Sequence, residues 1–286
     1  DWSSDVCSSD LPLSFEDTYI QNALGDGWLA RVGQWKSVFN YETFTSSRTQ
    51  QFVERSLVNQ YFTQQFIQGL FGGWEGETVR VFGCYNDGGG NSNIAEVQSN
   101  GNPTEWAGSA RVDWKLDGAW GQFKDMQGWR GSPFAAMLGA SFNWQRASGN
   151  PPSGRLSTGN GLIATDQATK ANVNAPMTLL SYTADLNLRG DGWSFWTAFL
   201  GNLVYNGDRT AEAMGVENAV SYGTVVQGGV FVSDSLELIA RYEGLWVSSN
   251  MPFTTKYGPN ALNAQTLNIL TVGANWYLDR KSTRLN

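Results

Sequence analysis

The feature that most constrains this chain is an alternation of apolar and polar side chains. From Glu105 to Leu116, one parity is apolar and the other is polar or charged except at Ala107. The apolar set is Trp106, Gly108, Ala110, Val112, Trp114 and Leu116, and the polar set is Glu105, Ser109, Arg111, Asp113 and Lys115. Because successive side chains of a β-strand point to opposite faces, this segment predicts a strand with one face toward lipid and the other toward water.

About eleven segments of this kind recur along the chain. The candidate strands span residues 13–23, 27–36, 66–75, 77–86, 105–116, 134–146, 177–190, 192–205, 220–232, 235–247 and 265–278. Tight turns rich in Gly, Asp, Ser and Glu alternate with long loops at 37–65, 87–104, 147–176, 206–219 and 248–264. Only the connection 117–133 breaks this alternation, because it is too long for a simple turn. Short turns on one side and long loops on the other predict an all-β, antiparallel transmembrane β-barrel.

The charged residues within these strands define which face is wet. In 177–190, Asp185 and Arg189 share a parity that opposes an apolar set, and in 235–247 the same is true of Glu237, Arg241 and Glu243. A slip of one residue would place Arg241 in hydrocarbon, at a cost of about 2 to 4 kcal/mol near the midplane. The register of these strands is therefore well specified. The stretches 13–23, 27–36 and 66–75 alternate less cleanly, and their faces are not assigned.

Both ends of the chain have an unusual composition. Residues 1–11 and 279–286 resemble translated sequencing-adapter DNA, and we expect neither stretch to belong to the folded protein. The expected organisation is an adapter-like stretch at 1–11, a partial outer-membrane barrel at 12–278 and a second adapter-like stretch at 279–286. The genuine chain would then be cut from a longer gene.

Composition excludes several kinds of chemistry. The chain has no histidine, and Cys84 is the single cysteine between residues 12 and 278, so Ser-His-Asp catalysis, Cys-His catalysis and a cysteine-based metal site are excluded there. A net charge of −7 argues against nucleic-acid binding. No run of about 18 apolar residues could form a membrane-spanning helix. We therefore expect no enzyme activity, no cofactor and no bound metal.

The long loop at 37–65 has a different periodicity from the strands. Ser47 and Gln50 have the spacing of a capping box, and Val53, Leu57 and Tyr61 recur every four residues, which predicts a helix within 45–62. On such a helix, Arg48 and Arg55 would project on nearly the same side, about 10 Å apart along the axis. One interpretation is a helix that packs on the barrel wall and turns both guanidinium groups to the lumen. The alternative is an ordinary solvated helix face.

Four stretches carry a resemblance to a known family. They are FEDTYI at 15–20, ARVGQWK at 30–36, SSRTQQFVERSLVN at 46–59 and TVGANWYL at 271–278. In these stretches the chain resembles the phosphate-selective porin O and P family of outer-membrane channels. The resemblance implies a homotrimeric barrel of about 16 strands in the bacterial outer membrane, with an inward-folded loop whose arginines and lysines attract anions.

Strand parity supports this placement of the loop. If residues 25–27 form a periplasmic turn, closing a barrel of about 16 strands needs about three strands before this chain and two after it, so the chain holds about eleven of them. The loop 37–65 then joins the fifth and sixth strands, where porins of this size have their constriction. Arg48 and Arg55 become the candidate selectivity residues, with Lys36 as a weaker match. Arginine suits such a site because its planar fork holds phosphate oxygens bidentately.

Five further cations have the parity of the lumen. They are Arg80, Arg111, Lys115, Arg189 and Arg241. They either extend a positive track along the wall or pair with neighbouring acidic residues and stabilise it. The family's central phosphate-binding lysines come from later loops; here Lys170 and Arg155 are the candidates for that role, and the spacing does not decide between them. The sequence thus predicts passage of small anions, with phosphate or polyphosphate as a hypothesis from resemblance.

Two other functions stay open at this point. A general or sugar-permeable porin would lack anion preference, and for sugars would line its lumen with aromatic residues; Phe82 and Phe231 have lumen parity. A soluble all-β binding or adhesion protein would instead bury its Trp-rich faces against a second sheet. For the porin interpretation, the expected partners are small inorganic anions and outer-membrane lipid.

Overall fold

The structure is a computed structural model that describes residues 17–64, 66–88, 104–147, 163–165, 177–206, 218–247, 253–255 and 266–278. Within these ranges, eleven antiparallel strands form one sheet, in which every strand pairs with the strands next to it along the chain. The strands are β1 (Thr18–Gly25), β2 (Trp28–Lys36), β3 (Phe66–Glu75), β4 (Val79–Asn86), β5 (Thr104–Asp117), β6 (Ala135–Ala147), β8 (Met177–Gly190), β9 (Trp193–Asn206), β10 (Ala219–Phe231), β11 (Leu236–Val247) and β13 (Thr266–Trp276).

The eleven strands predicted from the alternation are confirmed. Ten begin within two residues of the predicted position, whereas β1 begins at Thr18, five residues later than expected. A separate pair, β7 (Ile163–Thr165) and β12 (Phe253–Thr255), lies in two stretches predicted as loops. Such three-residue strands are too short to show a readable alternation.

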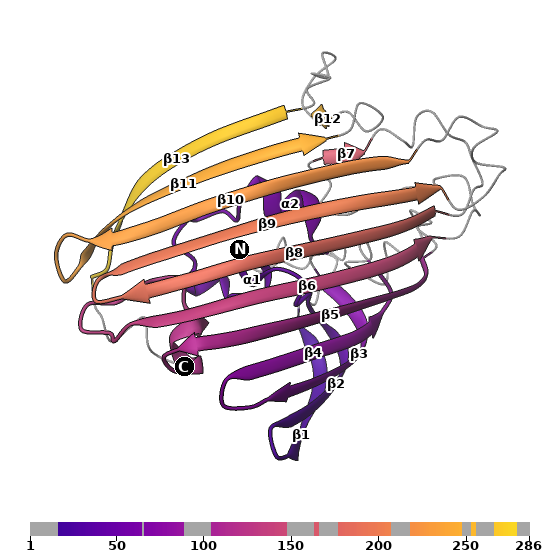
Figure 1. The fold of residues 1–286 in the computed structure, drawn as a ribbon, viewed down its shortest axis with the longest axis horizontal. Coiled ribbons are helices and arrows are strands. Elements are labelled where there is room, and N and C mark those ends of the chain that lie inside the picture. The colour runs from indigo at the N-terminus through magenta and orange to yellow at the C-terminus, as the bar shows by residue number, and fades with distance from the viewer. Residues whose placement is uncertain are drawn as a thin grey trace, which may run out of the picture.

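Tight turns gather at one end of the sheet (Figure 1). The turn between β1 and β2 has positive φ at Gly25, Asp26 and Gly27, which explains its glycines. The turns β3–β4, β8–β9 and β10–β11 lie at the same end, because the sheet is a simple antiparallel meander. The short-turn and long-loop ends predicted from the sequence are therefore confirmed for the described strands.

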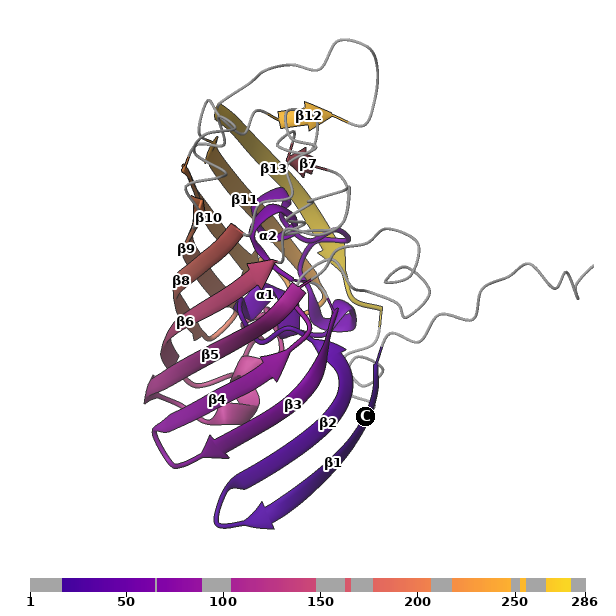
Figure 2. The same ribbon diagram turned by 90° about the vertical axis from the view of Figure 1, so that its right-hand side faces the viewer.

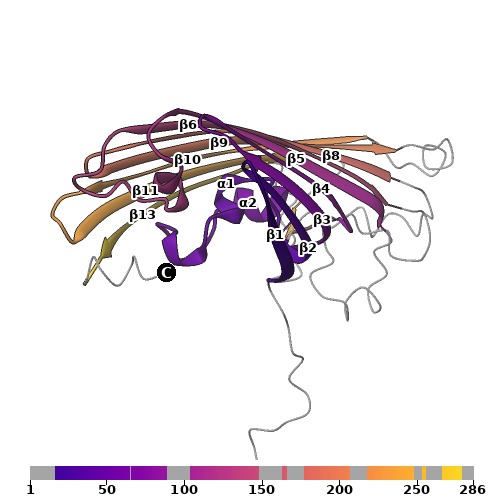
Figure 3. The ribbon, with the colours of Figure 1, turned by 90° about the horizontal axis from the view of Figure 1, so that it is seen from below.

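The sheet is a curved wall with the short helices on its concave side (Figures 2 and 3). They are α1 (Tyr41–Phe44), the 3-10 turn η1 (Ser47–Thr49) and α2 (Leu57–Phe62), all from the segment between β2 and β3. A further 3-10 turn, η2 (Trp120–Lys124), lies in the connection between β5 and β6. No helix of the described residues is both long and apolar enough to cross a membrane.

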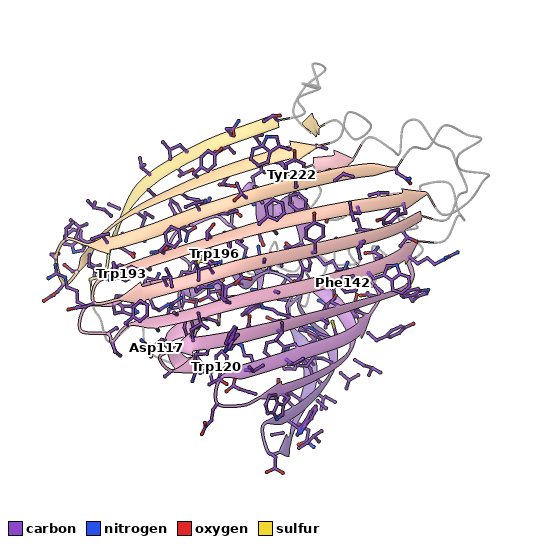
Figure 4. The ribbon with its side chains drawn as sticks, viewed as in Figure 1. Asp117, Trp120, Phe142, Trp193, Trp196 and Tyr222 are labelled. Atoms are coloured by element: carbon purple, nitrogen blue, oxygen red, sulfur yellow. The ribbon has the colours of Figure 1, made fainter. Side chains whose placement is uncertain are left out.

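The convex face exposes large apolar side chains on almost every strand. The alternation assigned to β5, β6, β8 and β11 is confirmed: Val112, Trp114, Leu138 and Leu238 are exposed, and on β8 Ala184 is exposed beside the buried Asp185. At the short-turn end, aromatic side chains on this face are Trp28, Trp114, Phe134, Trp193 and Trp276. Toward the other end, Tyr222 and Phe142 are on the same face, and Figure 4 labels both together with Trp193. Two aromatic belts around an apolar band are typical of a lipid-facing barrel wall.

The concave face is covered rather than empty. Phe39, Tyr41, Val58, Tyr61 and Phe62 of the segment between β2 and β3 are buried. They pack against inward side chains of the wall, among them Met137, Leu179, Trp196, Leu200, Val225 and Leu245. Burial of this apolar surface, at about 25 cal/mol per Å², holds the segment on the wall. The inner face therefore includes a docking surface for a loop.

Candidate functional site

The segment 37–64, named here the inner loop, is the candidate constriction. The sequence predicted a helix over 45–62, and this is wrong: the helical parts are only α1, η1 and α2, with a non-helical stretch at residues 50–56. The predicted capping box at Ser47 and Gln50 is also wrong. Instead, Ser46 accepts from the Arg48 N–H and Ser56 accepts from the Asn59 N–H, so each serine caps a separate short helix.

Contacts with the wall explain why the four-residue pattern fails. Val53, which was expected to face the wall, is 100% exposed. Gln51, two residues earlier, is buried: its amide nitrogen donates to Glu237 Oε1 at 2.7 Å and to Ser194 Oγ at 2.8 Å. The Gln227 amide donates to Gln51 Oε1 at 2.8 Å. These hydrogen bonds to β9, β10 and β11 hold residues 50–56 in a non-helical conformation, which a local sequence pattern cannot predict.

Arg55 holds the inner loop together. Its guanidinium donates to the carbonyl oxygens of Glu42 (3.0 Å), Thr43 (3.4 Å) and Thr45 (3.0 Å), at the end of α1. Arg48 lies in η1 with its side chain exposed. The prediction that Arg48 and Arg55 project from one helix face is therefore wrong, and the two arginines have different surroundings.

A buried charge cluster fixes the inner loop to β11. The Glu42 carboxylate accepts from the Ser56 N–H (2.7 Å) and lies 3.6 Å from the Arg241 guanidinium. Arg241 also pairs with Glu243 at 2.9 Å and donates to the Glu54 carbonyl. Burial raises the pKa of Glu42, against the effect of Ser56 and Arg241. Arg241 thus acts as a clamp between loop and wall.

A second charge cluster, named here the wall cluster, lies on β4, β5 and β8. Arg80 pairs with Asp113 at 2.7 Å, and Arg111 pairs with Asp113 at 2.7 Å and with Asp185 at 2.8 Å. The Arg111 and Asp113 side chains are completely buried. The Phe44 ring of the inner loop lies 5.1 Å from the Arg111 guanidinium carbon. The inner loop therefore covers this cluster.

Gly139 on β6 makes the wall cluster possible. Asp113 and Asp185 are both register partners of Gly139, on opposite sides of β6. A Cβ atom at Gly139 would lie 2.2 Å from Arg111 Nη2 and 2.7 Å from Asp185 Oδ1. Because Gly139 has no side chain, the Arg111 side chain can extend across β6 and reach Asp185 on β8.

The other predicted cations have varied surroundings. Arg189 donates to the carbonyls of Gln122 and Asp125 and to the Tyr41 hydroxyl. The Lys115 ammonium lies 5.1 Å from the Trp120 ring centroid, and the Lys36 ammonium lies 5.7 Å from that of Phe66. For Arg80, Arg111 and Arg241, the observed ion pairs fit the alternative of pairing with neighbouring acids. Lys170 and Arg155 lie outside the described residues.

The inner loop also contacts the connection 118–134 between β5 and β6. The Tyr41 hydroxyl donates to the carbonyls of Phe123 and Asp125, both at 2.9 Å. The Met126 N–H donates to the Thr49 carbonyl at 3.0 Å, and the Thr49 hydroxyl donates to the Lys124 carbonyl at 3.1 Å. The unusual length of this connection was visible in the sequence, but its role as a support for the inner loop was not.

Comparisons with known proteins give a family match and a similar solved structure. Residues 3–112 match the family described as phosphate-selective porin O and P. Among solved structures, the outer-membrane expressed OmpT of Vibrio cholerae is similar, with a TM-score of 0.35 and 7% sequence identity, over 88% of this chain and 78% of that chain. No curated protein matches the sequence.

The family match confirms the resemblance stated from the sequence for its first three stretches, and the fourth, at 271–278, lies outside the matched residues. It covers β1 to β4, the first part of β5 and the whole inner loop. Together with the lipid-type convex face, it indicates the bacterial outer membrane as the location and supports an outer-membrane porin.

Proposed function

We propose that this chain is part of an outer-membrane porin similar to the phosphate-selective porins O and P, and that the porin is a passive diffusion channel for small anions, including phosphate. The observation that carries the proposal is the exposed Arg48 on an inner loop that is firmly held against the wall. A charged group at a narrow part of a pore sets its ion selectivity.

The buried acidic residues near the inner loop do not oppose anion preference, because each has a partner within the protein. Glu42 and Glu243 lie in the clamp with Arg241, and Glu237 accepts from Gln51 and Tyr277. Their charges are therefore offset or engaged within the protein. Arg48 has no hydrogen-bond or ion-pair partner for its guanidinium among the described residues, so its charge faces solvent.

The finer parts of the proposal come from the resemblance. A complete barrel of about 16 strands, assembled as a homotrimer, would place the inner loop across each pore. Phosphate is the suggested solute because the family is described by it. Passage through such a pore needs weak binding and release and no catalytic group, so we propose a channel rather than an enzyme.

The test is the reversal potential of the full-length porin in a planar lipid bilayer under a KCl gradient. We expect an anion-selective potential for wild type that shrinks in Arg48→Gln. Glu54→Gln is the matched control, since Glu54 is an exposed acid on the same loop whose carbonyl, not its carboxylate, accepts from Arg241. Removing Glu54's charge should leave or increase the anion preference.

Other outcomes would favour the other functions. A neutral or cation-selective potential in wild type would contradict anion preference and leave a general or sugar-permeable porin. Absence of conductance would contradict the channel and favour the alternative of a soluble binding or adhesion protein. The broad exposure of apolar side chains on the convex face speaks against that last function, because it would be costly in water.

A further inference from the structure

Two buried carboxylates share one arginine beneath the inner loop. Glu42 of α1 lies 3.6 Å from the Arg241 guanidinium, and Glu243 lies 2.9 Å from it. All three side chains are buried, and that of Glu42 is completely inaccessible to water. These three residues are named here the clamp. With both acids ionised, the clamp holds two negative charges for one positive charge, and an excess charge is costly to bury.

The same two carboxylates hold the start of α2 on the wall. Glu42 accepts from the Ser56 N–H at 2.7 Å and from the Ser56 hydroxyl at 2.5 Å. Glu243 accepts from the N–H groups of Leu57, at 2.5 Å, and Val58, at 3.3 Å. Three consecutive backbone N–H groups of the inner loop thus donate to the clamp. If the loop moved off the wall, these contacts would be lost together and Glu42 would meet water.

The other titratable groups around the clamp have partners elsewhere or face solvent. Arg55 donates to backbone carbonyls, and the Glu54 carboxylate is exposed. Tyr41, Tyr61 and Glu237 bond to the connection 118–134, to Ser221 and to Gln51, respectively. The strands β9, β10 and β13 contain no Asp, Glu, Lys or Arg. The charge balance of the clamp is therefore set by its own three residues.

Glu42 is the acid of the clamp that becomes buried when the inner loop docks. In water the pKa of a glutamic acid is about 4.3. Desolvation beneath the loop raises the pKa of Glu42, and this effect outweighs those of Ser56 and Arg241, which lower it. A carboxyl group whose pKa is higher in the docked state binds its proton more tightly there. Docking is therefore favoured at low pH, and that advantage is lost as the pH rises through the raised pKa.

We propose that the clamp makes the inner loop a proton-linked gate, which takes up a proton on docking, is held most firmly in acid and loosens as the pH rises. A protonated Glu42 leaves Arg241 to pair with Glu243 alone, so that one acid then balances one base. Its carbonyl oxygen still accepts from the Ser56 N–H. The gate concerns how the constriction is held and does not depend on which solute passes.

The experiment measures amide hydrogen exchange of the full-length porin in lipid vesicles from about pH 5 to about pH 8, with each rate divided by the intrinsic rate at that pH. In wild type, the protection of the Ser56, Leu57 and Val58 amides should fall at least about fivefold as the pH rises, since a pKa difference of one unit changes the docking equilibrium about tenfold. Amides of β8 should keep their protection, because they do not contact the clamp. In planar bilayers, fluctuations of the open-channel current should increase over the same pH range.

Three variants assign this response to the clamp. Glu42→Gln keeps the shape of the side chain but has no titrating proton, so the protection should stay constant within about twofold over the same pH range. Glu243→Gln leaves one acid for Arg241 and should also reduce the response. Glu54→Gln is the matched control, because Glu54 is an exposed acid on the same loop, and it should keep the full response. Since Glu42 is on the loop and Glu243 is on the wall, a folding failure of one variant leaves the other as a test.

Two results would overturn the proton-linked gate. One is a wild-type inner loop whose protection is constant or increases as the pH rises. The other is a Glu42→Gln variant that keeps the wild-type response, since the proton would then bind elsewhere. Both results are independent of the reversal potential of Arg48→Gln, which tests the anion channel. A loop without pH response in an anion-selective porin would refute the gate alone, whereas a pH-dependent loop in a pore without anion preference would refute the anion channel alone.

Discussion

The wall cluster and the exposed cations of the inner loop and of the connection 118–134 both use basic residues, but in opposite ways. Arg111 has the parity of the lumen, yet it is buried and paired with Asp113 and Asp185. Arg48 and Lys124 lie in the 3-10 turns η1 and η2, outside the sheet, and both are exposed. Arg111 in the wall links neighbouring strands through ion pairs and is covered by Phe44, whereas the exposed Arg48 can contact a permeating ion.

This difference shows that the parity of a residue in a strand predicts which face its side chain is on, but not whether that side chain is exposed to water. A side chain with lumen parity reaches water only where nothing covers the wall, and here the inner loop and the connection 118–134 cover much of it. Wall cations should therefore affect stability, and loop cations should affect selectivity. The predictions below test that division.

The largest effect is expected for Arg111→Met. It leaves Asp113 and Asp185 buried without their shared cation, and breaking a buried ion pair from one side costs about 3 to 5 kcal/mol. Urea unfolding of the full-length porin in lipid vesicles should show this loss of free energy of unfolding.

A double variant provides the control for Arg111. Arg111→Met combined with Asp185→Asn removes the carboxylate that has lost its cation, whereas Asp113 keeps its pair with Arg80, so part of the stability should be recovered. If Arg111→Met alone changes the free energy of unfolding by less than about 1 kcal/mol, the wall cluster does not stabilise the barrel.

Gly139→Ala should have the next largest effect. The new methyl group would meet Arg111 Nη2 at 2.2 Å and force the guanidinium away from Asp185. Overpacking of this kind costs about 1 to 3 kcal/mol. Gly83→Ala is a suitable control in the same urea titration, because a Cβ atom there meets nothing within 4 Å. Equal stability of the two variants would contradict the crossing role of Gly139.

The strands were predictable because their signal is local. In β5 and β8 the two-residue period alone separates the exposed Val112 from the buried Asp113 and Asp185, and lipid exposure makes that contrast strong. In β9, Trp196 and Leu200 point inward and pack under the inner loop, so inward positions are apolar as well. The sequence could not distinguish a loop-docking surface from a lipid-facing one.

The candidate site was predictable in position but not in conformation. Strand parity placed the loop 37–65 across the lumen, and the structure places the inner loop on the concave face. The predicted helix failed at Gln51, whose partners Ser194, Gln227 and Glu237 come from distant strands. The support that the connection 118–134 gives to the inner loop was missed for the same reason, since only tertiary contacts bring this connection to Thr49.

The smallest effects are expected within the inner loop, where Arg55 and Arg48 form a matched pair. Arg55→Gln loses up to three bonds to carbonyls of the α1 region, and we expect a loss of about 1 to 2 kcal/mol for a half-buried charged donor. Arg48→Gln should change the free energy of unfolding by less than about 0.5 kcal/mol, because its side chain is exposed and unbonded.

Urea titrations measure the free energy of unfolding of both variants. Bilayer recordings should then separate the two variants further. Arg48→Gln should reduce anion preference while the pore stays stable. Arg55→Gln should add fluctuations of the open-channel current, because the inner loop is held less firmly. If Arg48→Gln destabilises the porin as much as Arg55→Gln, Arg48 is a structural residue, and the division between wall charge and loop charge is wrong.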